Sequence, residues 1–237
     1  PTQYGSTVAI GNVGVSPSEF MPRLFAENGQ LLDGQGRITL DTPEALRALK
    51  NYRETYAYSD RTVYDFWKNA LEGFADGSAA MTVVFINYAS HILNLNMSQI
   101  AGKLGIAPVP GQKPLLGGGV IGITPSCACP EAACAFLDWL YAGLVAPVFT
   151  MLGGLSPCRS AYNNRDINEQ YPWLSAARKS FPNAQRRSDS TYYSNFSELR
   201  LETILASYIQ QAVLGVCSPE EALRQAQEDC DSYFQPW

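Results

Sequence analysis

Residues 71–91, LEGFADGSAAMTVVFINYASH, form the stretch that decides the predicted fold. The stretch begins on one face of a helix, and Asp76-Gly77 is a turn signal because glycine readily takes positive φ. Residues 81–86 are an unbroken apolar run, which predicts one fully buried strand. Ligands of open α/β sheets bind at the carboxyl ends of strands. The polar residues that end this strand therefore mark a candidate site, although an ordinary strand-to-helix loop has the same pattern: Asn87, Tyr88 and Ser90.

The composition excludes several classes of protein. The 237 residues, 46% of them hydrophobic, suffice for one large domain or two lobes with a real core. No apolar run approaches about 18 residues, so we expect no membrane span. The net charge of −5 and the scattered basic residues argue against nucleic acid as a partner. Because no signal peptide is visible and the chain starts at Pro1 without Met, we expect a mature or trimmed product.

The six cysteines fit either disulfides in an exported protein or free thiols, and the sequence leaves the pairing open. Cys217 and Cys230 flank a predicted helix, which separates them by roughly 18 Å and disfavours a disulfide between them. The only histidine is His91, and no familiar zinc spacing occurs among Cys127, Cys129 and Cys134. We therefore expect neither a metal site nor another cofactor.

The rest of the chain alternates predicted helices with short strands, which is an α/β pattern. Strands are predicted at residues 7–10, 104–109 and 117–124, and a hairpin at 31–40. Helices are predicted at residues 18–28, 43–56, 63–75, 130–141, 144–152, 171–179, 196–214 and 218–233. The clearest helix starts are at Thr42-Pro43 and Ser218-Pro219, where a capping side chain precedes proline.

Five phrases resemble the bacterial extracellular solute-binding proteins of family 1, the sugar-binding receptors of ABC importers that are related to maltose- and trehalose-binding proteins. Each phrase is weak alone, but the five occur in the family's order and cover most of the chain. They are LEGFADGSAAM at 71–81, KLGIAPVPG at 103–111, LLGGGVIGITPSCACPEAACAFLDWL at 115–140, GGLSPCR at 153–159 and SPEEALRQA at 218–226.

The resemblance implies an α/β fold of the periplasmic-binding-protein-like type II class, with two lobes that close on a ligand. It assigns residues 1–103 and 155–237 to the second (C-terminal) lobe and residues 104–154 to a return segment of the first (N-terminal) lobe. Family members carry about 100 further residues, the size of a domain, before the segment that resembles 4–12. We therefore expect a partial first lobe with uncovered apolar surface, in a fragment or a naturally shortened member.

The resemblance also implies a function. Such receptors are extracellular or periplasmic, bind a carbohydrate between their lobes and deliver it to the transmembrane subunits of an ABC permease. They touch the membrane only through a lipid anchor, which here would lie outside these residues. Aromatic rings cover the apolar face of the sugar, and amides and backbone groups bond its hydroxyls. We therefore expect a transport receptor and not an enzyme.

The resemblance indicates which residues contact the ligand. Asn87 and Tyr88 follow the strand at which the family places a binding side chain, and three glycines allow backbone N–H groups to approach a ligand. Arg159 is suited to sugar hydroxyls or a carboxylate. Each residue also has a purely structural interpretation. Asn87 and Tyr88 fit a solvent-facing loop, the glycines fit a tight turn, Arg159 fits a brace for loop carbonyls, and Trp67 fits core packing. The full predicted set is Trp67, Asn87, Tyr88, Gly117, Gly118, Gly119, Arg159 and Tyr193, with Tyr192 as an alternative to Tyr193.

Two other kinds of function stay open at this stage. The same fold serves sensing or adhesion, which differ from transport only in the partner. A hydrolase would need a triad that uses His91 or a pair of carboxylates. No G-x-S-x-G motif is present, and Asp60 and Asp65 are the only carboxylates that could end a predicted strand. We expect Trp173 to be a core residue and His91 to be a loop or packing residue.

Overall fold

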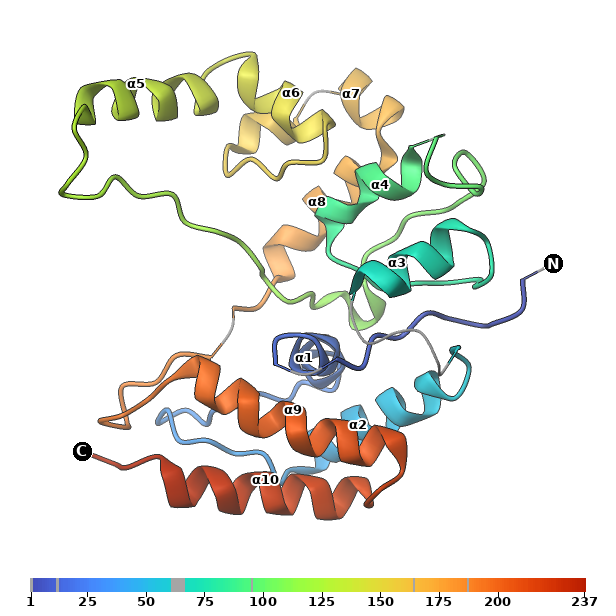
Figure 1. Cartoon of the computed structure of the whole chain (residues 1–237), viewed down its shortest axis with the longest axis vertical. Helices are drawn as coiled ribbons and strands as arrows, with labels where there is room; N and C mark the ends of the chain where they lie inside the picture. Colours follow the sequence, from blue (N-terminus) through green and yellow to red (C-terminus); the bar gives the residue numbers. More distant parts are fainter. Residues whose placement is uncertain (1, 12, 61–66, 95, 164, 187) are drawn as a thin grey trace. The chain divides into compact units, whose positions relative to one another are not determined.

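The structure is a computed structural model that describes residues 2–11, 13–60, 67–94, 96–163, 165–186 and 188–237. The chain forms two compact units, each with its own helices (Figure 1). Unit 1 comprises Pro1–Val84, Val109–Leu116 and Asn183–Trp237, and unit 2 comprises Phe85–Pro108 and Gly117–Pro182. These units differ from the lobe boundaries that the family resemblance implies, which refer to a complete receptor and stay a prediction.

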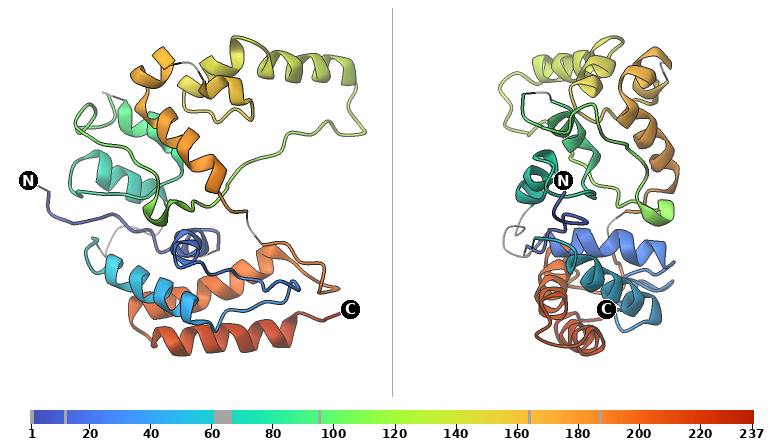
Figure 2. Two further views of the ribbon diagram at one scale, coloured as in Figure 1. Left: turned by 180° about the vertical axis from the view of Figure 1, so that it is seen from behind. Right: turned by 90° about the vertical axis from the view of Figure 1, so that its right-hand side faces the viewer.

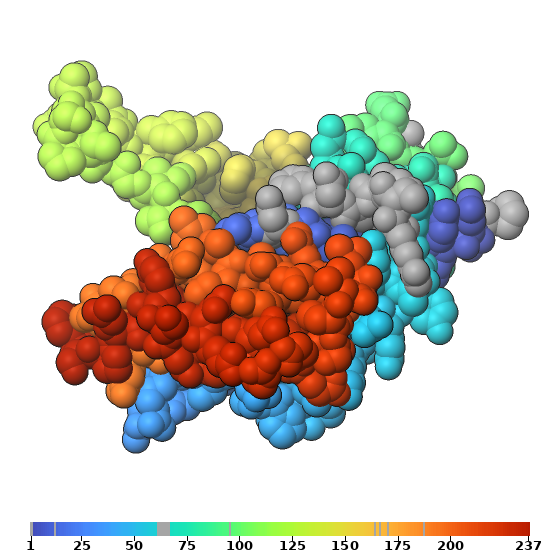
Figure 3. Space-filling model, turned by 60° about the horizontal axis from the view of Figure 1, so that its bottom comes forward, coloured from blue at the N-terminus to red at the C-terminus, as the bar shows by residue number. Residues whose placement is uncertain are grey.

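Unit 1 is a packed group of helices. It contains α1 (Ser16–Ala26), α2 (Pro43–Tyr56), α3 (Trp67–Ala75), η2 (Pro110–Gln112), α9 (Glu198–Leu214) and α10 (Pro219–Tyr233). The packing joins α9 to α10, α1 to α2, and both α1 and α2 to α9 (Figures 1 and 2). Side chains of α9 and α10 form one continuous surface, orange and red in Figure 3. The fully buried side chains of this core include Phe20, Leu24, Leu49, Tyr52, Leu205 and Leu223.

The helix ends in unit 1 follow the predicted signals. The Thr42 hydroxyl accepts the Ala45 N–H at 3.2 Å before α2, and the Ser218 hydroxyl accepts the Glu221 N–H at 3.1 Å before α10. These bonds satisfy N–H groups that have no partner inside the helix. Helix α9 ends at Leu214 and is capped by Gly215, whose φ of 81° is a conformation that favours glycine.

The predicted strands pair far less than a sheet requires. The hairpin is confirmed by the bridge between Leu32 and Ile38, but all β-pairing among the described residues consists of isolated bridges. The prediction of a fully buried strand at 81–86 is wrong, because Met81 is 64% exposed and only Thr82 lies in a bridge. A strand is stabilised by its neighbours on both sides, and this segment has one. The described chain is therefore helix-rich, and the predicted α/β sheet is not formed within it.

Unit 2 has a smaller core of its own. It contains η1 (Ile86–Tyr88), α4 (Ala89–Leu93), α5 (Pro130–Tyr141), α6 (Val145–Met151), η3 (Arg159–Tyr162), α7 (Arg165–Gln170) and α8 (Pro172–Ser180), while η4 (Phe181–Asn183) lies at its end. Trp173 is 1% exposed and packs with Ala89, Ala161 and Tyr162, which confirms its predicted core role. The Tyr162 hydroxyl donates to the Ser156 carbonyl at 2.8 Å, so its burial leaves no unpaired polar group.

The segment 117–152 leaves apolar surface uncovered. Helix α5 forms as predicted and extends away from the rest of unit 2, with its main contact on α6 (Figure 2). None of its residues is buried, and Phe136 and Trp139 are 54% and 56% exposed. This agrees with the expectation of uncovered apolar surface in the return segment. Among the described helices, none alone could cross a membrane, and only α5 and α6 together, bent by 66°, meet the length and hydropathy requirement.

Candidate ligand-binding site

The residues predicted to contact a ligand lie in three places. Unit 2 holds Asn87, Tyr88, the three glycines 117–119 and Arg159, whereas unit 1 holds Trp67 and Tyr193 in two different surroundings.

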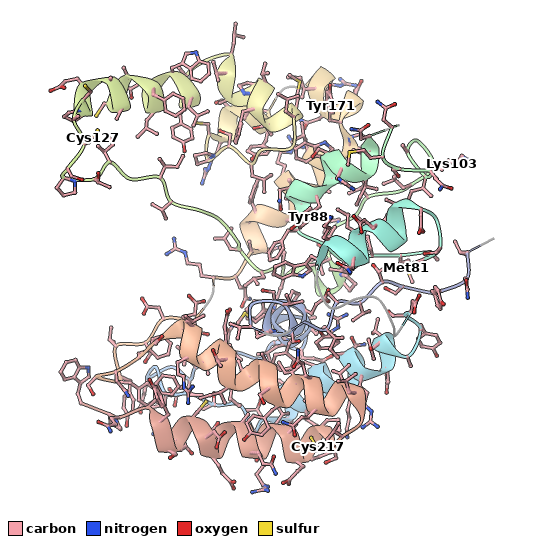
Figure 4. The ribbon with its side chains drawn as sticks, viewed as in Figure 1. Met81, Tyr88, Lys103, Cys127, Tyr171 and Cys217 are labelled. Atoms are coloured by element: carbon pink, nitrogen blue, oxygen red, sulfur yellow. The ribbon has the colours of Figure 1, made fainter. Side chains whose placement is uncertain are left out.

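In unit 2, the short helix η1 carries Asn87 and Tyr88 and leads directly into α4, which packs into the core. Asn87 is exposed, and Tyr88, which directly precedes α4, is half-buried. Figure 4 labels the position of Tyr88. Ala89 and Ile92 of α4 are buried in the unit, so the helix cannot shift without opening the core. Folding therefore fixes the backbone of η1 and leaves the Asn87 amide free to face a ligand.

Two glycines lie directly against this segment. A Cβ on Gly117 would come within 3.0 Å of the Phe85 ring, which precedes η1. Gly153 has a φ of 99°, and a Cβ there would overlap Ser90 in α4. Gly118 and Gly119 are exposed and have no atoms within 4 Å of a Cβ position, so they form an open approach. The structure thus brings Gly117, and additionally Gly153, next to the predicted site.

Arg159 begins η3 and is exposed. Ala161 and Tyr162 in the same turn belong to the core that also contains Ala89 of α4. No described residue bonds the Arg159 guanidinium, so the interpretation as a brace for loop carbonyls has no support. An exposed, unpaired guanidinium is available for a hydroxyl or a carboxylate.

In unit 1, two extended segments run in parallel and end at one edge. The bridges join Tyr4 to Ala79 and Thr7 to Thr82, and the Thr7 hydroxyl donates to the Thr82 hydroxyl at 2.6 Å. Because the segments run in the same direction, their carboxyl ends at residues 10 and 84 lie at the same edge. Trp67 is half-buried and packs on Ala9, Val15 and Ala70. The Trp67 side chain therefore packs against this cluster and also lies at this edge.

The end of the first of these segments was not predicted as part of the site. The pattern of residues 7–10 predicts a strand, but a single sequence does not show which strands are neighbours. The usable signal was Gly11 and Gly14 directly before the helix that starts at Ser16, because a glycine-rich strand-to-helix turn is where ligands approach backbone N–H groups.

Tyr193 lies elsewhere in unit 1 and is 8% exposed. Its hydroxyl oxygen accepts the Ile38 N–H at 2.9 Å, and its ring contacts Tyr192, Phe196 and Phe234. Burial raises the pKa of Tyr193. It lines an open hollow of about 360 Å³ beside the hairpin. These contacts favour the packing interpretation over a ligand contact.

The chemistry around these residues offers few charged groups. Over the described residues, no group of three or more His, Cys, Asp or Glu side chains could hold a metal ion. All six cysteines are free thiols. His91 is half-buried in α4. Unit 2 thus offers an amide, a phenol, backbone N–H groups and one guanidinium, and unit 1 offers an indole; groups of these kinds bind by hydrogen bonds and ring contacts.

A sequence model of the family described as bacterial extracellular solute-binding protein matches residues 8–173. The chain belongs to this family. A curated relative from Sinorhizobium fredii, the probable amino-acid ABC transporter periplasmic-binding protein y4oP, is 22% identical over 98% of the chain and 53% of its own length. The chain therefore spans about half the length of this relative.

Solved structures of family members share the fold. The maltose-bound MalE3 of T. maritima has a TM-score of 0.83 and 22% identity over 97% of this chain and 60% of its own. An ABC transporter solute-binding protein of Thermotoga lettingae, bound to α-D-tagatose, has a TM-score of 0.80 and 24% identity over 97% of this chain and 59% of its own. The fold is therefore that of periplasmic solute-binding proteins of the maltose-binding type. These relatives are binding proteins of transporters.

Proposed function

We propose that this chain is the solute-binding receptor of an ABC importer and that its ligand is a neutral carbohydrate. The observation that carries the proposal is the exposed Asn87 amide beside the half-buried Tyr88 ring, on an anchored turn, in a chain of this family. An amide donates to and accepts from sugar hydroxyls, and an aromatic ring covers the apolar face of a sugar. Maltose and tagatose in the solved relatives support the same ligand class.

In this proposal the protein binds and releases its ligand without changing it. In unit 2, Asn87, Arg159 and the N–H groups of the glycine-rich segment bond hydroxyls, and Tyr88 supplies ring surface. In unit 1, Trp67 is the candidate ring contact. Each hydrogen bond replaces one to water, so its net contribution is about 0.5–1.5 kcal/mol. The affinity then depends on several such contacts held in place before binding.

A second ligand class has support from one relative and one residue. The Sinorhizobium protein is named as a probable amino-acid transporter component. Arg159 is exposed and unpaired, and a guanidinium binds a carboxylate through two parallel hydrogen bonds. If the ligand is an amino acid, Arg159 holds its carboxylate.

The partner and the location follow from the same proposal. A receptor of this kind works outside the cytoplasm, held by a lipid anchor beyond these residues, and hands its solute to the transmembrane subunits of the permease. A sensing or adhesion module would use the same site with another partner. Two genes for permease subunits beside the gene for this protein would favour transport.

The ligand class is tested by a thermal-shift screen. Maltose, D-tagatose and a set of L-amino acids are added to the protein, and the midpoint of unfolding is measured for each. A ligand at 100 times its Kd stabilises the folded state by about 2.7 kcal/mol, which raises the midpoint visibly. A shift with a sugar supports the proposal, and a shift with amino acids alone supports the second ligand class. A flat response to every compound would contradict both.

The screen is repeated with Asn87→Ala. Because Asn87 is exposed, we expect this change to alter the stability of the unliganded protein by no more than about 0.5 kcal/mol. We expect it to remove most of the shift caused by the ligand. Thr203→Ala in α9, where a half-buried side chain loses a hydroxyl bond to the Leu199 carbonyl within the helix, serves as the control.

A further inference from the structure

Three consecutive backbone carbonyls in unit 1 are each bound by a side chain from a different helix. Tyr52 of α2 donates its hydroxyl to the Ala9 carbonyl at 2.5 Å, and Gln210 of α9 donates its amide to the Ile10 carbonyl at 2.9 Å. Ser16 of α1 donates its hydroxyl to the Gly11 carbonyl. We call these three side chains the carbonyl clamp.

The clamp is a buried arrangement. Tyr52 and Ser16 are 0% exposed, and Gln210 is half-buried. The Glu19 carboxylate accepts the Ala9 N–H and pairs with Arg23, whose guanidinium lies 4.7 Å from the centre of the Tyr52 ring. A backbone carbonyl far from water is costly to leave unbonded, so each clamp bond favours one conformation of residues 9–11.

Residues 9–11 continue an extended segment, and the backbone of such a segment ordinarily pairs with a neighbouring strand. Thr7 still pairs with the neighbouring segment, through its bridge to Thr82, whereas residues 9–11 form no described bridge. Side chains from three helices thus supply the hydrogen bonds that a neighbouring strand would supply to these carbonyls in a sheet. This explains how an edge with only isolated bridges is held in one position.

We propose that Tyr52, Gln210 and Ser16 are positioning residues that hold the backbone of residues 9–11 in the conformation required for ligand binding. This rests on the proposed function, because the clamped edge is the one on which Trp67 packs. None of the three side chains needs to touch the ligand. Loss of a clamp bond lets the edge sample other conformations. The measured affinity is then the intrinsic affinity multiplied by the fraction of molecules that are in the binding conformation.

The test compares Gln210→Met with Gln211→Met in the full chain. Both changes replace an amide with a thioether of similar length on neighbouring residues of α9, but the described bonds of the Gln211 side chain go to Ser207 of its own helix. Amide hydrogen exchange of the peptide that covers residues 8–16 is measured without ligand, and the Kd for maltose is measured by titration calorimetry. Tyr52→Phe, which removes a different clamp bond, is the second variant.

We expect Gln210→Met and Tyr52→Phe to speed exchange in residues 8–16 and to weaken maltose binding, each roughly fivefold, while α10 peptides and the Gln211→Met control stay unchanged. Unchanged exchange in both clamp variants would overturn the proposal. Equal acceleration throughout unit 1 would overturn it too, because that is a loss of stability and not of position. Faster exchange with an unchanged Kd for maltose would show that binding does not depend on the clamp. If the unaltered protein does not bind maltose, the proposed ligand fails, and the exchange result still decides whether the clamp holds the edge.

Discussion

Gly153→Ala is predicted to displace the segment that carries Asn87 and Tyr88. Gly153 has a φ of 99°, and a Cβ added there would lie 2.3 Å from the Ser90 hydroxyl oxygen and 2.6 Å from the Ser90 Cβ. Ser90 lies in α4, directly after η1, and its hydroxyl bonds the Asn87 carbonyl at 3.4 Å. Alanine at this position must therefore push α4 and η1 away from the turn.

The loss of stability caused by Gly153→Ala has two parts that can be measured separately. An alanine held at a left-handed φ costs roughly 1–2 kcal/mol, and overpacking against a fixed neighbour costs roughly 1–3 kcal/mol. The sum, about 2–5 kcal/mol, lowers the free energy of unfolding of unit 2. Gly102→Ala provides the first part alone, because Gly102 has a φ of 79° and no atom within 4 Å of its Cβ position.

Equilibrium urea unfolding of four variants checks the reasoning. They are Gly153→Ala, Gly102→Ala, Ser90→Gly and the double variant of positions 90 and 153. Removing the Ser90 side chain vacates the space, so Gly153→Ala must cost less by about 1–3 kcal/mol in the Ser90→Gly background. The explanation fails if Gly153→Ala costs no more than Gly102→Ala, or if Ser90→Gly recovers nothing.

Three further predictions concern single side chains. Ser218→Ala removes the cap of α10 and should lower the free energy of unfolding by about 1 kcal/mol in urea titrations, whereas no loss would mean that water replaces the cap. The hydrogen bond from the Arg37 N–H lowers the pKa of the Asp33 carboxyl on folding. Its contribution to stability is therefore fully present above the unfolded pKa of about 3.9 and is lost as the pH falls below that value through the lower folded pKa. Acid unfolding of Asp33→Asn should therefore depend less on pH than that of the unaltered protein, and equal dependence would refute this. Burial raises the pKa of the Cys230 thiol to about 12, so iodoacetamide should modify exposed Cys129 in the folded protein and Cys230 only after unfolding, as mass spectrometry of the peptides will show.

Helices were predictable because their signals are local. Thr42 and Ser218 each precede a proline and cap the helix that follows, and the hairpin at 31–40 has its own turn residues. These features depend on residues within a few positions of one another, so a single sequence contains all that is needed.

The sheet and the packing depend on distant segments and were predicted less well. Residues 81–86 have the composition of a buried strand, yet Met81 is exposed, because burial requires neighbours on both faces. Helix α5 has an apolar stripe with no buried residue for the same reason. Gly117 was predicted as a site residue, but Gly153 and the carbonyl clamp were not, since Gly153 lies 63 positions from Ser90 and two of the clamp bonds join residues 43 and 200 positions apart.

The central claim is that this chain binds a neutral sugar reversibly and leaves it unchanged. The most direct measurement is a proton NMR saturation-transfer experiment with maltose and the protein. We predict transfer from the protein to ring protons of the sugar, and a maltose spectrum that is identical before and after a day with the protein. The absence of transfer to this and every other sugar tried, or the appearance of products, would contradict the claim.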